Sequence, residues 1–140
     1  MNELIFVYGS LRRGSAHAMA QWLASVADWQ GEGRVAGTLY RVSWYPALVI
    51  AGEGVAADEE GVQGDVFRLH EASALAQLDA FEGVRGSVAD EYRRERLAIR
   101  MASGEVQAWV YVWQQSVSGL KPVKGGDWLQ SLIFAGPESL

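Results

Sequence analysis

No cysteine occurs in this sequence, which excludes thiol nucleophiles, disulfides and cysteine metal sites together. Histidine is almost as scarce: His17 and His70 lie far apart in the chain, and no carboxylates stand at ligand spacing beside them. We therefore expect no bound metal ion and no cofactor, and we assign neither histidine a role.

Long basic runs and long apolar runs are also missing. The net charge of −5 and the absence of any long Lys/Arg run argue against binding to nucleic acid or to an anionic membrane, which leaves small molecules or proteins as partners. The apolar stretch near the N-terminus is too short for a signal peptide or a membrane span, and no basic segment precedes it. A cytoplasmic location is the simplest expectation. The oligomeric state stays open.

What the chain does contain is enough for one proper core. Its 140 residues fit a single domain over 1–140, with 49% apolar and 21% charged residues and no low-complexity stretch. The composition and alternation of the chain predict strands over residues 4–8, 62–69, 92–101 and 106–113, with further short strands between 29 and 50. Glycines at bends suit a curved sheet. We expect a mixed α/β (α+β) fold, in which the sheet curls toward a small β-barrel with flanking helices.

Helices are predicted in three places. Ser15 can cap a helix that carries an apolar stripe, and residues 71–82 form the second helix. Asp127 is expected to cap a third helix over residues 128–134. A polar, glycine-bearing loop is expected over residues 51–60.

Glu82 is the most informative residue. With helical spacing, Leu75, Leu78 and Glu82 lie at i, i+3 and i+7, so whatever buries the two leucines also draws in the carboxylate. Gly83 follows at once, as is usual just past a helix end, which puts Glu82 at the negative end of the helix dipole. Burial and the dipole would both raise the pKa of Glu82, and a raised pKa prepares a carboxylate for proton transfer.

The segment Val7-Tyr8-Gly9-Ser10-Leu11-Arg12-Arg13-Gly14 resembles the opening motif of the gamma-glutamylcyclotransferase-like (AIG2-like) family. The resemblance continues in order over nearly the whole chain, through Gly37-Thr-Leu39-Tyr40, Tyr45-Pro46-Ala47-Leu48, Gly64-Asp-Val66-Phe67, Leu78-Asp79-Ala-Phe81-Glu82-Gly83-Val84, Tyr92-Arg-Arg94, Ala108-Trp-Val-Tyr111-Val and Gly126-Asp127-Trp128.

This resemblance implies a closed or nearly closed β-barrel and a cavity beside the Tyr-Gly-Ser-Leu loop. Enzymes of the family release 5-oxoproline from gamma-glutamyl compounds. In this reaction the α-amine of the substrate attacks the γ-carbonyl of the same molecule and expels the amine bound to that carbonyl. The family's proton-transfer residue maps onto Glu82, which is then expected to act as general base and afterwards as general acid. The resemblance assigns substrate binding to Tyr8, Gly9, Ser10, Leu11, Tyr45 and Tyr111.

Several residues also have a plainer interpretation. Arg12 and Arg13 could attract an anionic substrate or could be solvated surface, and the sequence favours neither. Tyr111 shares a strand face with two tryptophans, which is typical of a core, and Tyr45 could belong only to a rigid turn before Pro46.

Two other kinds of site fit the loop after the first strand poorly. The loop after the first strand lacks the Walker spacing of a phosphate loop, and Ser10 does not lie in a nucleophile elbow. The competing hypothesis is a non-catalytic module that binds a small carboxylate or a peptide end in the same cavity.

Overall fold

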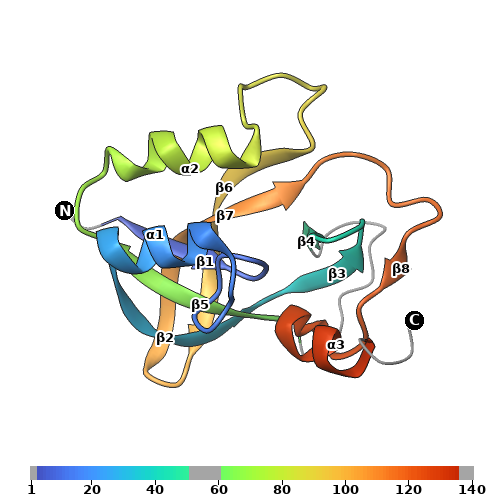
Figure 1. Ribbon diagram of the computed structural model, residues 1–140, viewed down its shortest axis with the longest axis horizontal. Helices are drawn as coiled ribbons and strands as arrows, with labels where there is room; N and C mark the ends of the chain where they lie inside the picture. Colours follow the sequence, from blue (N-terminus) through green and yellow to red (C-terminus); the bar gives the residue numbers. More distant parts are fainter. Residues whose placement is uncertain (1–2, 51–60, 136–140) are drawn as a thin grey trace.

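In the computed structural model, which describes residues 3–50 and 61–135, five strands close into a β-barrel (Figure 1). In order around the barrel they are β1 (Leu4–Val7), β5 (Val62–Leu69), β2 (Ala27–Val35), β6 (Tyr92–Met101) and β7 (Gly104–Trp113). A second sheet has the order β4 (Pro46–Ile50), β3 (Gly37–Arg41) and β8 (Lys121–Pro122). The expected mixed α/β fold with a small barrel is confirmed.

Three helices lie outside the barrel in the described ranges: α1 (Ala18–Val26), α2 (Ala74–Glu82) and α3 (Trp128–Ala135), the last preceded by the 3-10 turn η1 (Lys124–Gly126). Figure 1 shows α3 beside the small sheet, well away from α1 and α2. Arg41 of β3 fixes α3 there, because its guanidinium lies over the Trp128 ring and donates to the Ser131 hydroxyl at 3.1 Å. No helix of the described ranges is long and apolar enough to cross a membrane.

β1 is covered on both faces, which explains why its sequence is apolar without alternation. Ile5 and Val7 pack in a cluster with buried residues of α1 and α2. Phe6 and Tyr8 point the other way, into a cluster that includes Trp128 of α3. The loop that follows β1 is therefore held by a strand that cannot shift without disturbing both clusters.

The predicted strands of the barrel agree with the structure. β5 and β6 have the predicted bounds, and β6 pairs with β7 in the expected antiparallel hairpin. The bend expected near the glycines of β2 is a register shift between Trp29 and Gly31. The loop predicted over residues 51–60 lies outside the described residues.

Two helix predictions were wrong at their N-terminal ends. His17, not Ser15, caps α1, because the His17 Nδ1 accepts the N–H of Met19 at 3.0 Å, whereas the Ser15 hydroxyl accepts only the N–H of His17. α2 begins at Ala74, three residues later than predicted. The preceding residues form tighter bonds to the third residue back, such as the Ala74 N–H to the Glu71 carbonyl at 3.1 Å.

Candidate active site

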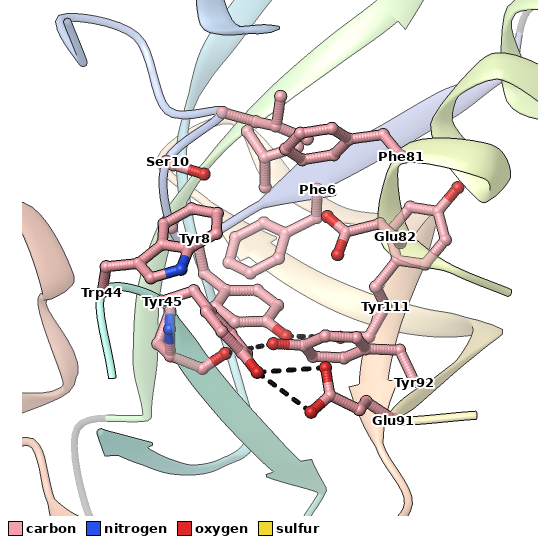
Figure 2. Close-up of a pocket in the computed structure, with 14 residues that line it drawn as sticks. Phe6, Tyr8, Ser10, Trp44, Tyr45, Phe81, Glu82, Glu91, Tyr92 and Tyr111 are labelled. Atoms are coloured by element: carbon pink, nitrogen blue, oxygen red, sulfur yellow. Dashed lines mark hydrogen bonds between the residues drawn. The ribbon is translucent and has the colours of Figure 1, made fainter. Parts of the chain in front are cut away.

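A cavity of about 270 Å³ lies between the loop after β1, the turn before β4 and the end of α2 (Figure 2). Every site residue expected from the sequence lines it: Tyr8, Gly9, Ser10, Leu11, Tyr45, Glu82 and Tyr111. The cavity also has lining residues that sequence reasoning did not assign to the site: Phe6, Val7, Trp44, Pro46, Phe81, Glu91 and Tyr92. Segments that lie far apart in the chain, from Phe6 to Tyr111, thus meet at one place.

Glu82 is the last residue of α2, and its carboxylate points into the cavity beside Phe6 (Figure 2). The helix ends there because Gly83 adopts the left-handed conformation, with φ of 71°, which favours glycine. Leu78 is fully buried on the same face, as the helical spacing predicted. The spacing of the leucine stripe therefore does direct this carboxylate inward.

The pKa of Glu82 is raised to about 7. Burial is the larger cause, and the negative charge of Glu91 adds to it. The sequence predicted burial and the helix dipole as the causes of a raised pKa. Burial is confirmed, but the second cause is the carboxylate of Glu91, which the tertiary structure brings near Glu82. No residue in the described part of the chain donates a hydrogen bond to the Glu82 carboxylate, so nothing offsets the loss of water around it.

The loop from Tyr8 to Leu11 forms another wall of the cavity. A Cβ atom at Gly9 would lie 3.0 Å from the Pro46 ring, so any larger residue would force the ring or the loop to shift, and glycine allows the loop to pack closely against the start of β4. The Arg12 N–H donates back to the Gly9 carbonyl at 3.1 Å and closes the turn. Within the described ranges, no acceptor takes the backbone N–H groups of Gly9, Ser10 and Leu11. These three donors are thus free for a ligand.

Tyrosine hydroxyls lock the cavity walls to one another. The Tyr8 hydroxyl donates to the Tyr111 carbonyl at 2.6 Å, and the Tyr92 hydroxyl donates to the Pro46 carbonyl at 2.6 Å. Burial raises the pKa of both phenols, so they stay neutral and act as fixed walls.

Tyr111 was open to two interpretations, and the structure supports a part of each. The residue lines the cavity, but its hydroxyl turns to α2 and donates to the Asp79 Oδ1 at 2.7 Å. The Arg94 Nη1 lies 3.4 Å from the same Asp79 oxygen. Because Asp79 precedes Glu82 by one helical turn, these contacts hold the end of α2 against β6 and β7.

Arg12 and Arg13 lie outside the cavity. Arg12 is buried, and its guanidinium donates to Asp65 and to Asp127, both at 3.0 Å. The Arg13 guanidinium lies 3.9 Å from the centre of the Trp29 ring. Arg12 is therefore neither a residue that attracts substrate nor solvated surface. Its guanidinium cross-links the barrel to the start of α3.

Glu91 is the most consequential residue that the sequence did not assign to the site. It is exposed at the end of the loop before β6, and the Tyr45 hydroxyl donates to its two carboxylate oxygens at 3.0 and 2.9 Å. Tyr92 and Phe81 belong to the motifs that carry the family resemblance, so that resemblance could have found them. No local pattern distinguishes Glu91 from a solvated loop acid.

Comparison with known proteins places this geometry in a family. The family model described as gamma-glutamyl cyclotransferase, AIG2-like, matches residues 5–130. The gamma-glutamylcyclotransferase family protein YtfP of Escherichia coli K12 is 40% identical over 131 residues, which cover 89% of this chain and 95% of YtfP. Its name states a family and no substrate.

Solved structures show the same fold. The YtfP solution structure from Escherichia coli aligns with a TM-score of 0.58 at 33% identity, covering 90% of this chain and 96% of that one. Bacillus subtilis YkqA aligns with a TM-score of 0.72 at 20% identity, and the match covers 98% of this chain but 43% of YkqA. A mouse AIG2-like protein aligns with a TM-score of 0.63 at 22% identity, over 84% of this chain and 81% of the mouse chain.

Proposed function

The chain belongs to the gamma-glutamyl cyclotransferase, AIG2-like family, and from this premise we propose that it releases 5-oxoproline from a gamma-glutamyl amine or gamma-glutamyl amino acid. The observation that carries the proposal is Glu82, a cavity carboxylate whose pKa of about 7 lies in the range that suits a general base. Near neutral pH about half of the molecules would hold this carboxylate ionised, ready to accept a proton.

In the proposed reaction, Glu82 takes a proton from the α-ammonium of the substrate. The freed amine forms a bond to the γ-carbonyl carbon, and protonated Glu82 gives its proton to the leaving nitrogen. The carbon–nitrogen bond to the leaving amine then breaks, and Glu82 accepts the second proton, which the ring nitrogen loses as it becomes the lactam N–H. This proton passes to the departing amine, so the products are 5-oxoproline and the amine in its ammonium form, with no water consumed and no covalent enzyme intermediate. Because the attack is intramolecular, the cavity has only to hold a folded substrate conformation.

The free N–H groups of Gly9, Ser10 and Leu11 supply the second part of the proposed site. Three adjacent backbone donors suit the α-carboxylate of the substrate or the oxyanion that develops at the γ-carbonyl. Glu82 lines the same cavity as these donors. The loop would therefore hold the negatively charged group of the substrate, while the carboxylate at the end of α2 acts on the same substrate as a base. The two polar walls and the neutral tyrosines between them support an acyl-transfer site.

A panel of gamma-glutamyl amines and gamma-glutamyl amino acids, assayed for 5-oxoproline, tests this function. We expect release from at least one class, and a loss of about 10³-fold in kcat for Glu82→Gln, the middle of the range for a general acid–base group. Circular dichroism and ligand binding should be preserved, since glutamine keeps the size of the side chain. Release at the normal rate by the Gln variant would refute the role of Glu82.

The competing function, a non-catalytic module for small carboxylates, predicts a different result in the same panel. Such ligands would raise the Tm of the protein, and no member of the panel would yield 5-oxoproline. That outcome would overturn the proposed reaction while leaving the cavity as a binding site.

A further inference from the structure

The imidazole of His17 contacts two rings of the cavity wall. It lies nearly parallel to the Trp44 indole, with ring centres 5.9 Å apart and planes at 6°. It also meets Phe81 edge to face, with ring centres 5.6 Å apart and planes at 71°. Both distances fall in the range of about 4.5–7 Å over which aromatic rings attract one another. Because Trp44 and Phe81 line the cavity, the His17 ring bridges two of its walls.

The start of α1 fixes the orientation of this ring. The His17 Nδ1 accepts the backbone N–H of Met19 at 3.0 Å, and the backbone N–H of His17 donates to the Ser15 hydroxyl at 3.2 Å. Since Nδ1 accepts, the neutral imidazole carries its hydrogen on Nε2. One edge of the ring is thus held by the helix cap, and its faces and remaining edge are left for contacts with other rings.

Trp44 lies at the rim of the cavity, because it lines the cavity while 63% of its surface is exposed. Its other ring neighbour is Tyr45, at 5.0 Å between ring centres, and Tyr45 lies 6.4 Å from Tyr92 (Figure 2). A row of rings therefore follows the cavity wall, in the order Phe81, His17, Trp44, Tyr45 and Tyr92. Within this row, His17 is the link between α2 and the turn before β4.

The same contact restrains the end of α2. Phe81 directly precedes Glu82, the last residue of the helix. Residues two apart on a helix point about 200° from one another, so Asp79 and Phe81 lie on opposite faces of α2. Asp79 is held by the Tyr111 hydroxyl at 2.7 Å, and Phe81 is contacted by the His17 ring. The helix turn that carries Glu82 is therefore restrained on both faces.

We propose that His17 is a positioning residue for substrate binding, whose ring holds Trp44 and Phe81 in place at the rim of the cavity. This inference rests on the proposed function and adds to it a residue that does not itself line the cavity. His17 transfers no proton in the reaction, and its effect passes through the two rings that it contacts. Because these rings contact the substrate before and during the reaction alike, loss of the His17 ring should raise KM more than it lowers kcat.

Two substitutions separate the ring of His17 from its role as a helix cap. His17→Asn keeps an acceptor for the cap and removes the ring, so we expect the Tm to be preserved and KM to rise about 5-fold, with kcat within about 2-fold. His17→Phe keeps a ring and removes the acceptor, so the Tm should fall by about 4 °C while KM stays within about 2-fold. His70→Gln, at the exposed histidine that pairs with Asp28, is the control and should leave KM unchanged.

Proton NMR of the imidazoles tests the contact without any substrate. The chain has two histidines, so His70→Gln assigns both sets of ring signals. Trp44→Ala should shift the His17 ring protons and leave those of His70 in place, because the indole ring current acts only on the ring stacked against it.

The two measurements distinguish this inference from the reaction itself. Unshifted His17 signals would refute the contact. Shifted signals, without 5-oxoproline release from any gamma-glutamyl compound, would support the contact and refute the proposed reaction. Release with a normal KM in His17→Asn, or a KM raised equally in His17→Phe, would refute the positioning role of the ring and leave the reaction standing.

Discussion

Glu82 and Asp65 are both acids drawn away from bulk water, and their surroundings differ in what donates to them. Asp65 is 2% exposed and accepts hydrogen bonds from the Arg12 Nε, the Arg13 N–H and the Trp29 Nε1 at 3.0, 3.1 and 3.1 Å. Glu82 has no donor among the described residues, and its neighbour Glu91 is another acid. The contrast shows that two buried acids can differ in how well their charge is solvated. The lack of donors leaves the charged form of Glu82 poorly solvated, which allows burial to raise its pKa.

Removing the well-solvated acid should have the largest effect on stability. Asp65→Ala leaves three donors without their acceptor, with Arg12 still buried, and we expect the free energy of unfolding to fall by about 3 kcal/mol. Urea unfolding measures this, with Asp28→Ala, an exposed acid paired to Arg68, as the control. A loss below about 1 kcal/mol would show that Asp127, with Glu32 at 3.7 Å from the guanidinium, suffices to hold Arg12.

The unpaired acid should destabilise the fold at high pH. Because the folded pKa of Glu82 is about 7, above the ordinary value of 4.5, its stabilising contribution is present below about pH 4.5 and is lost as pH rises through 7. Relative to the native protein, Glu82→Gln should therefore gain about 2 kcal/mol between pH 5 and pH 8, after allowance for partial solvation. Equal pH dependence of urea unfolding in the two proteins would contradict the raised pKa.

The hydrogen bond from Tyr111 to Asp79 tests whether the site needs its helix held in place. Tyr111→Phe removes this bond alone, and we expect a loss of about 1 kcal/mol in stability and a fall of about 5-fold in kcat. Tyr40→Phe on β3 is the matched control, since its ring packs on the same core without lining the cavity. A change in stability with kcat intact would limit Tyr111 to a structural role.

The smallest expected effect is that of the Glu91 charge on the pKa of Glu82, and it can be measured from the pH dependence of kcat. Removing the charge of Glu91 with Glu91→Gln should lower the pKa of Glu82, so the rising acid limb of the pH–kcat profile should move to lower pH. Glu105→Gln removes the same charge from an exposed acid at the far end of the β6–β7 hairpin, so its profile should coincide with that of the native protein. A limb that stays in place would mean that burial alone sets the pKa of Glu82.

Much of the fold could be predicted because its signals are local. The alternation in β6 and the continuous apolar run of β1 reflect covering on one or on two faces, and both strands formed as expected. Helix starts were less predictable. Ser15 and His17 can both accept from a nearby N–H, and which of them caps α1 depends on where the chain enters the helix.

The site was predictable in part for the same reason. Glu82 could be found because the leucine spacing and Gly83 are features of one helix. Glu91 and Asp79 could not be assigned from residue spacing, since an acid in a loop or on a helix has the same sequence whether it meets water or a cavity. Arg12 looked like a loop cation and proved to be buried between two acids.

The sequence by itself determined the strands, the inward face of α2, the glycine-containing loop after β1 and the family to which these motifs belong. Only the tertiary structure decided what surrounds Glu82. The tertiary fold makes Glu82, Glu91 and the loop at residues 8–11 line one cavity, where burial and the charge of Glu91 raise the pKa of Glu82 to about 7. The physical reason is that periodicity records which side of a segment is apolar, whereas solvation of a charge depends on every segment that packs around it.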